Sequence, residues 1–226
     1  MKLVLFDIDG TLLKSGRQGR SVFASALAEV FGTTGDLEAY DFAGKMDPRI
    51  VLDLMTGAGV PEPVIHEKLP RLKALYTARL EETLRRDRME ILPGVVEILE
   101  SLAAREDVTL GLLTGNWEPG ARTKLSRFGL NRYFPFGAFG CDALDRSELP
   151  PVAWERAEKA TGRRFRPEET LIIGDSVHDV SCAKAHGIPC LAVATGWTPR
   201  DSLQDAGADW IVADLRQAGV TVDWLG

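Results

Sequence analysis

In the stretch LVLFDIDGTLL, residues 3–13, two aspartates interrupt a run of apolar residues. Leu3–Phe6 has the composition of a buried strand, and Asp7 and Asp9 follow it directly. Side chains two residues apart on an extended chain point to the same side. The pair is therefore either an acidic turn after a buried strand or part of a chemical site.

Further along the chain, short apolar runs end in glycine or polar residues and lead into segments whose apolar residues have helical spacing. Alternating strands and helices predict a parallel sheet with helices on both faces. The fold class that follows is α/β, with a three-layer, Rossmann-like parallel-sheet core. The predicted strands are Leu3–Phe6, Val108–Leu113, Leu171–Ile173, Cys190–Val193 and Trp210–Val212.

A long interval follows the first strand. About 95 residues separate it from the second strand, far more than one crossover helix needs. Apolar residues in this interval recur at helical spacing, so we predict an inserted α-helical cap domain over residues 15–91. A discontinuous catalytic core then comprises residues 1–14 and 92–226. Pro70 is expected to break or kink the third helix of the cap.

The composition narrows the class of protein. The chain has 226 residues, of which 45% are hydrophobic and 27% charged, as in ordinary globular proteins. The net charge of -6 disfavours nucleic acid or an anionic membrane as partner. Three cysteines without a CxxC pattern predict neither a disulfide framework nor a zinc site. The N-terminal apolar run suits neither a signal peptide nor a spanning helix, so we expect a cytoplasmic protein. We further expect a monomer or weak homodimer.

A second acidic group follows the strand Leu171–Ile173, where the sequence GDSVHD contains Asp175 and Asp179. Ligands of open parallel sheets bind at the carboxyl ends of the strands. If this end lies beside the first, carboxylates converge, and two of them about 4 Å apart repel by roughly 4 kcal/mol at an effective dielectric of about 20. A cation is then expected, and oxygen-only ligands favour Mg²⁺. Alternatively, these acids cap a helix N-terminus.

A third strand end supplies groups for an anion. Thr114, Gly115 and Asn116 follow Val108–Leu113 and offer a hydroxyl and backbone N–H groups to a phosphoryl oxygen. A cationic side chain should complete the site, and Arg146 precedes the helix predicted near Pro150. These parts suit phosphoryl transfer. The alternative cations, Lys124 and Lys159, lie in helical patterns and are expected to face solvent.

In these motifs the sequence resembles the haloacid dehalogenase superfamily of phosphohydrolases. The branch indicated has a small helical cap and contains phosphoglycolate phosphatases and β-phosphoglucomutases. DIDGT at residues 7–11 matches the family's first motif, Thr114 the second, and Gly174-Asp175 with Asp179 the fourth. The third motif usually carries a lysine, where this chain offers Arg146. The matches cover nearly the whole chain.

The resemblance implies an Mg²⁺-dependent phosphatase that acts through an aspartyl-phosphate. Asp7 would be the nucleophile, and Asp9 would protonate the leaving oxygen and then activate water. The metal would be held by the Asp7 carboxylate, the backbone carbonyl of Asp9 and Asp175, with Asp179 orienting a ligand. The implied phosphate-binding residues are Thr114, Gly115, Asn116 and Arg146.

The implied substrate is a small phosphorylated metabolite, either a phosphoglycolate-like compound or a sugar phosphate. In the cap, Lys45 and Arg49 are candidates for reading its non-phosphate end, or else they are solvated surface residues. One alternative function is a phosphosugar mutase, which would use the same core but shield its phosphoaspartate from water. Another is a catalytically idle binding protein on the same fold, against which the intact acidic set argues.

Overall fold

The central sheet of the computed structural model, which describes residues 1–218, is parallel throughout and has the strand order β5-β4-β1-β6-β7-β8. Each of the five predicted apolar runs lies in one of its strands; residues 219–226 of the predicted core lie outside the described residues. The two residues of β5 are too few to show a periodic pattern. The strands are β1 (Lys2–Phe6), β4 (Val108–Leu113), β5 (Gly137–Ala138), β6 (Thr170–Gly174), β7 (Cys190–Val193) and β8 (Trp210–Val212).

The register of β1 explains how the strand ends meet. Phe6 pairs with Leu112 of β4 on one side and with Ile173 of β6 on the other. The chain therefore leaves β1, β4 and β6 at the same level and at the same edge of the sheet. The strand order also reverses around β1, which is where open α/β sheets bind ligands.

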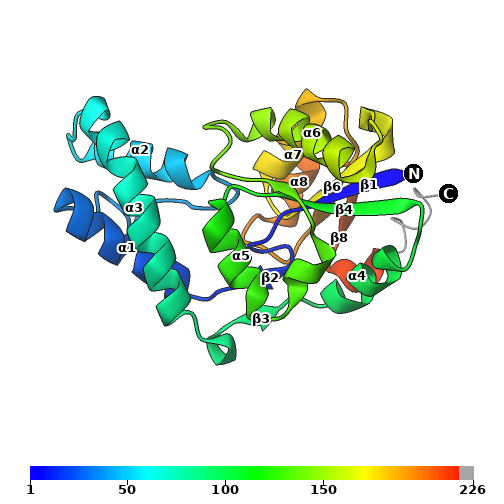
Figure 1. Ribbon diagram of the computed structural model, residues 1–226, viewed down its shortest axis with the longest axis horizontal. Coiled ribbons are helices and arrows are strands. Elements are labelled where there is room, and N and C mark those ends of the chain that lie inside the picture. Colours follow the sequence, from blue (N-terminus) through cyan, green and yellow to red (C-terminus); the bar gives the residue numbers. More distant parts are fainter. Residues whose placement is uncertain (219–226) are drawn as a thin grey trace.

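Helices cover both faces of the sheet, so the predicted three-layer α/β core is confirmed (Figure 1). Successive residues of β1 point to opposite faces: Val4 and Phe6 pack with α4 and α5, and Leu3 and Leu5 pack with α6, α7 and α8. The helices are α4 (Val95–Ala103), α5 (Glu118–Ser126), α6 (Leu149–Thr161), α7 (Val177–Ala185) and α8 (Arg200–Ala206). Short 3-10 turns are η1 (Arg86–Arg88), η2 (Leu130–Tyr133), η3 (Arg146–Glu148), η4 (Pro167–Glu169) and η5 (Leu215–Gln217).

The long interval after β1 forms three helices, α1 (Gln18–Phe31), α2 (Asp47–Gly57) and α3 (Glu62–Thr83). They group at one end of the molecule and bury a cluster of apolar side chains of their own (Figure 1). α3 continues through Pro70, so the proline does not end the helix. Its cost, about 3 kcal/mol, is offset by burial of the apolar face that contains Leu72, Tyr76 and Leu80.

A two-stranded antiparallel ribbon joins the sheet and the three helices. Its strands, β2 (Leu13–Lys14) and β3 (Glu90–Ile91), lie where the chain enters and leaves the interval. Two residues per strand give no alternation that a sequence could reveal. The ribbon falls at the predicted boundaries of the cap, and the division into core 1–14 and 92–226 and cap 15–91 stays a prediction. We use "cap" below for residues 15–91.

Trp117, at the start of α5, packs under the cap. Its ring stacks on Phe23 with centroids 6.2 Å apart and meets Tyr76 edge-on at 5.8 Å. An aromatic cluster thus links the strand β4 end to α1 and α3. Among the described residues, no helix combines the length and the apolarity that crossing a membrane requires.

Candidate active site

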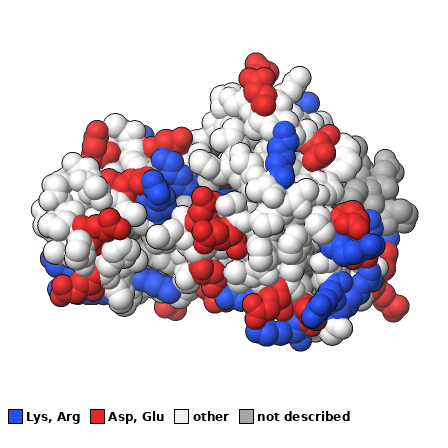
Figure 2. All heavy atoms as spheres, turned by 90° about the horizontal axis from the view of Figure 1, so that it is seen from above, with Lys and Arg blue, Asp and Glu red and all other residues white. Residues whose placement is uncertain are grey.

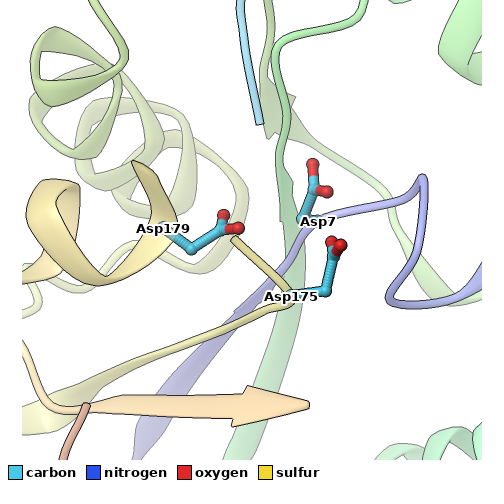
Figure 3. Close-up of side chains that lie close together, drawn as sticks. All are labelled: Asp7, Asp175 and Asp179. Atoms are coloured by element: carbon cyan, nitrogen blue, oxygen red, sulfur yellow. The ribbon is translucent and has the colours of Figure 1, made fainter. Parts of the chain in front are cut away.

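Three carboxylates from two strand ends converge at the edge of the sheet. Asp7 follows β1, Asp175 follows β6, and Asp179 lies in the first turn of α7. One oxygen of each lies within 4.8 Å of the others, and all three residues are buried. Figure 3 shows the three side chains close together, with the carboxylates of Asp175 and Asp179 directed toward Asp7. The structure therefore brings together the two acidic motifs that the sequence separates by more than 160 residues.

Burial and mutual repulsion make the carboxylates of this cluster harder to ionise than they are in water. Burial raises the pKa of Asp7 to about 6, although Arg146 acts in the opposite direction. Burial, followed by repulsion from Asp7 and Asp179, raises the pKa of Asp175 well above its ordinary value. Buried carboxylate oxygens at this spacing are the ligands that a hard divalent cation prefers. The donor set therefore fits Mg²⁺.

Glycines at two turns make room for Asp175. Gly10 has φ +90°, and a Cβ there would overlap the Asp175 carboxylate. A Cβ on Gly196 would overlap the same carboxylate. The hydroxyl of Thr11 donates to Asp175 Oδ1 at 3.2 Å. The carboxylate therefore lies against two close approaches of backbone that only glycine permits.

Arg146 lies in η3 and reaches the acidic cluster, as the sequence predicts for the cation of the site. Its Nη2 lies 3.0 Å from Asp7 Oδ1 and 2.5 Å from Asp179 Oδ1, and the residue is 6% exposed. Nη2 also donates to the carbonyl of Leu113, and Nη1 donates to that of Gly44 in the cap. The guanidinium therefore joins the acidic cluster, β4 and the cap.

Asp179 also caps α7. Its Oδ2 accepts hydrogen bonds from the backbone N–H and the hydroxyl of Ser176, at 3.0 and 2.6 Å. Ser176 Oγ in turn accepts from the Asp179 N–H, which completes a capping box. Asp179 is therefore part of the helix cap and part of the acidic cluster at the same time.

The turn after β4 is buried beneath the cap. Thr114 is fully buried, and its Oγ1 accepts a hydrogen bond from Asn116 Nδ2 at 2.9 Å. A Cβ on Gly115 would overlap the backbone carbonyl of Lys45 in the cap. The same Asn116 amide donates to Asp9 Oδ2 at 2.9 Å. The structure thus places the predicted phosphate-binding turn beside Asp9 and against the cap.

The expectation that Lys124 faces solvent is wrong. It is 5% exposed, and its Nζ lies 2.5 Å from Asp9 Oδ2 and 2.6 Å from Asn116 Oδ1. A sequence signal was present, because Lys124 shares the buried stripe of α5 with Ala121 and Leu125 at helical spacing. Lys159 is on the surface as expected and pairs with Glu155.

A cavity of about 840 Å³ lies between the strand ends and the cap. Asp7, Asp9, Thr114 and Arg146 line it from the core side. Lys45, one of the two predicted cap residues, lines the cavity from the opposite side. Arg49 is outside the lining, because it pairs with Asp53 one helical turn away at 2.8 Å on the exposed side of α2. The cavity thus connects the acidic cluster with one predicted cap cation.

Asp47, the first residue of α2 and not among the predicted site residues, also lines the cavity. Its N–H donates to the carbonyl of Gly115, and its Oδ2 accepts from the N–H of Trp117, both at 2.8 Å. Burial raises the pKa of the Asp47 carboxyl to about 6, and Lys124 acts in the opposite direction. The sequence could not have revealed the contacts of Asp47 with the turn after β4, because an acidic residue at the start of a helix is common for helix capping alone.

Comparison with known proteins agrees with this geometry. A family model described as haloacid dehalogenase-like hydrolase matches residues 4–193. Phosphoglycolate phosphatase 1 of Pseudomonas aeruginosa is 29% identical over 217 residues, which are 95% of this chain and 77% of that protein. A solved structure described as a predicted phosphatase from Clostridium acetobutylicum has a TM-score of 0.75 at 20% identity and covers 98% of this chain and 97% of that one. A predicted phosphoglycolate phosphatase from Haemophilus somnus has a TM-score of 0.71 at 22% identity, with 98% of each chain covered.

Proposed function

The chain belongs to the haloacid dehalogenase-like hydrolases, as a phosphatase of that family, and from this premise we propose that it hydrolyses a small phosphate monoester. The reaction depends on Mg²⁺ and passes through an aspartyl-phosphate on Asp7. The observation that carries the proposal is the convergence of Asp7, Asp175 and Asp179 around one point, beside Arg146 and under the cap.

The acidic cluster supports both a nucleophile and a metal site. The residues that would hold Mg²⁺ are Asp7 and Asp175 through their carboxylates and Asp9 through its backbone carbonyl, with Asp179 beside them. When bound, the ion supplies the positive charge that lets an anionic carboxylate approach an anionic phosphate. The raised pKa values of Asp7 and Asp175 show that burial and neighbouring carboxylates disfavour their charged forms, a cost that a bound cation would offset.

The aspartyl-phosphate on Asp7 divides the reaction into two displacements, and each displacement includes one proton transfer. Asp7 attacks phosphorus, and Asp9 gives a proton to the leaving oxygen as its bond to phosphorus breaks. In the second displacement Asp9 takes a proton from water, which attacks the phosphorus and frees Asp7. Thr114 and the backbone after it hold the phosphoryl oxygens, and Arg146 neutralises their charge.

The cap supports this chemistry by covering the site. Lys45 and Asp47 meet the Gly115 turn through close backbone contact, and Arg146 donates to Gly44. Bulk water is thereby kept from the phosphoryl group during transfer. The cavity volume of about 840 Å³ accommodates a small metabolite. Lys45, on the cap side, offers a positive charge to a carboxylate or phosphate at the far end of a substrate.

Phosphoglycolate and sugar phosphates are the candidate substrates. The curated relative from Pseudomonas aeruginosa is named for the first, and the lining of the cavity by both charged and aromatic side chains also suits the second. A phosphosugar mutase would use the same core residues. It differs in outcome, because a mutase moves phosphate between positions of a sugar without releasing it.

The test is a panel of phosphoglycolate, sugar phosphates and nucleotides, assayed for released phosphate with Mg²⁺ and again with a chelator. We expect sustained release that the chelator abolishes. Positional exchange on a sugar phosphate without release would instead identify a mutase.

We expect Asp7→Asn to reduce turnover by at least about 10³-fold while leaving the circular dichroism spectrum unchanged, because an amide is a poor nucleophile. Asp205→Asn, an exposed aspartate on α8, is the matched control. An Asp7→Asn enzyme as active as the parent would exclude Asp7 as nucleophile.

A further inference from the structure

One oxygen of Asp9 is held by a buried network that includes Lys124, a residue that no step above uses. Lys124 Nζ, at 2.5 Å, and Asn116 Nδ2, at 2.9 Å, both donate to Asp9 Oδ2. Lys124 also donates to Asn116 Oδ1 at 2.6 Å, and the Asn116 amide donates to Thr114 Oγ1. The network therefore connects β1, the turn after β4 and α5 through hydrogen bonds at one end of the Asp9 carboxylate.

The burial of Lys124 sets it apart from the lysines and arginines of the surface. On the face shown in Figure 2, basic and acidic side chains are interspersed over the exposed surface. The Lys124 side chain, in contrast, is 6% exposed, whereas that of Asp9 is 27% exposed and faces the cavity. A buried ammonium is costly unless charged partners surround it. Here Asp9 is a direct partner, and the nearby Asp47 carboxylate also interacts with the Lys124 charge.

We propose that Lys124 is a positioning residue for the acid and base of the reaction. Together with Asn116 it fixes Oδ2 of Asp9, so that Oδ1 is presented to the leaving oxygen in the cavity. The inference rests on the proposed function. In the first displacement the proton on Oδ1 passes to the leaving oxygen as the ester bond breaks; in the second, Oδ1 takes a proton from water.

A role as a second phosphate cation is the competing explanation for a buried lysine in this place. The contacts separate the two roles. Arg146 reaches Asp7, the proposed nucleophile, whereas the direct partners of the Lys124 ammonium are Asp9 and the Asn116 side chain. The ammonium is thus turned toward the proton-transfer residue.

The experiment compares Lys124→Met and Lys124→Arg with the parent and with Lys159→Met, which removes an exposed lysine of α6. Single-turnover phosphorylation rates are measured for an alkyl phosphate, whose leaving oxygen needs a proton, and for p-nitrophenyl phosphate, whose leaving oxygen does not. For Lys124→Met we expect about a 100-fold loss with the alkyl ester and less than about 10-fold with the aryl ester. Lys124→Arg should recover part of the alkyl rate, and Lys159→Met should match the parent.

The inhibition constant of inorganic phosphate distinguishes the two roles, because it would rise in Lys124→Met if Lys124 bound phosphate. We expect its inhibition constant to stay within about twofold of the parent value in Lys124→Met. Equal losses with both esters, or a parallel rise in the inhibition constant, would overturn the positioning role. Should Lys124→Met fail to fold, Lys124→Gln, which keeps a donor without the charge, is put through the same comparison. A parent enzyme that hydrolyses neither ester would instead refute the proposed function.

Discussion

At the level of single residues, Asp7, Asp9 and Asp175 each have a different direct partner. Asp7 meets Arg146, Asp9 meets Lys124, and Asp175 accepts from Thr11. Asp47 differs, because its direct partner is a backbone N–H and burial raises its pKa to about 6 from an ordinary 3.8. Compared with water, its environment thus shifts the balance toward the neutral carboxyl.

The raised pKa of Asp47 predicts a pH-dependent stability. The folded protein binds a proton at Asp47 more tightly than the unfolded chain does, so this residue's contribution to the free energy of unfolding falls as pH rises from about 4 to about 6. Asn at this position still accepts from Trp117 but cannot ionise. We expect Asp47→Asn to raise the Tm at pH 8 by about 2 to 4 °C, equivalent to about 1 kcal/mol in a protein of this size, with little difference at pH 4.

Thermal unfolding of the parent and Asp47→Asn at pH 8, 6 and 4 makes the comparison. The difference in Tm must shrink as pH falls. If the difference in Tm were the same at all three pH values, ionisation of Asp47 would not be its cause.

At the scale of elements, the cap and the core meet through backbone. The segment that leads into α2 lies against the turn after β4, with the Asp47 N–H bonded to the carbonyl of Gly115. A side chain at position 115 would overlap the Lys45 carbonyl, and one at position 44 would overlap Ser176. Gly44 in the cap and Gly115 in the core therefore let the two backbones approach closely. The resulting contact covers the proposed phosphate-binding turn.

Gly115→Ala should therefore displace the cap rather than unfold the core. A backbone carbonyl cannot rotate away as a flexible side chain would, so the segment around Lys45 has to shift. We expect kcat/KM to fall by at least about 10-fold, because small misplacements of binding groups are costly in phosphoryl transfer. Gly57→Ala, where a Cβ meets open space, is the matched control and should retain parental kinetics. Parental kinetics in Gly115→Ala would show that this contact does not set the active geometry.

At the scale of the whole molecule, folding itself assembles the repelling acids. Asp7 and Asp175 are brought together only when β1 pairs with β6, so the folded state carries their repulsion and their burial while the unfolded chain does not. A ligand that binds the folded cluster should therefore stabilise the entire protein.

Mg²⁺ is expected to raise the Tm, and to do so more at pH 8 than at pH 5. Protons compete with the ion for carboxylates whose pKa is raised, so the metal binds more weakly at acidic pH. Mg²⁺ at about 100 times its dissociation constant adds about 2.7 kcal/mol to the free energy of unfolding. Asp175→Asn should lose this shift, and the exposed Asp205→Asn should keep it. An equal shift in both variants would place the ion elsewhere.

Local patterns in the sequence predict the layered core and the acids that follow β1 and β6. A strand that is buried on both faces, such as β1, is a continuous apolar run, and the aspartates directly after it mark where that run leaves the sheet. The same logic fails for β2, β3 and β5, because two residues cannot show a period. The expected break at Pro70 does not occur, because packing of the apolar face of α3 outweighs the local preference of proline.

Neighbouring residues along the chain are enough to predict the longer strands and the carboxylates at their ends. The helical stripe of α5 could indicate that Lys124 is buried, but not that its partner is Asp9. Tertiary packing also sets the bond of Asp47 to the turn after β4 and the place of Arg49 outside the cavity. Whether a charge lies on the surface or in a site depends on which distant segment packs against it. That partner is set by the strand order around β1 and by the seating of the cap, which no local pattern encodes.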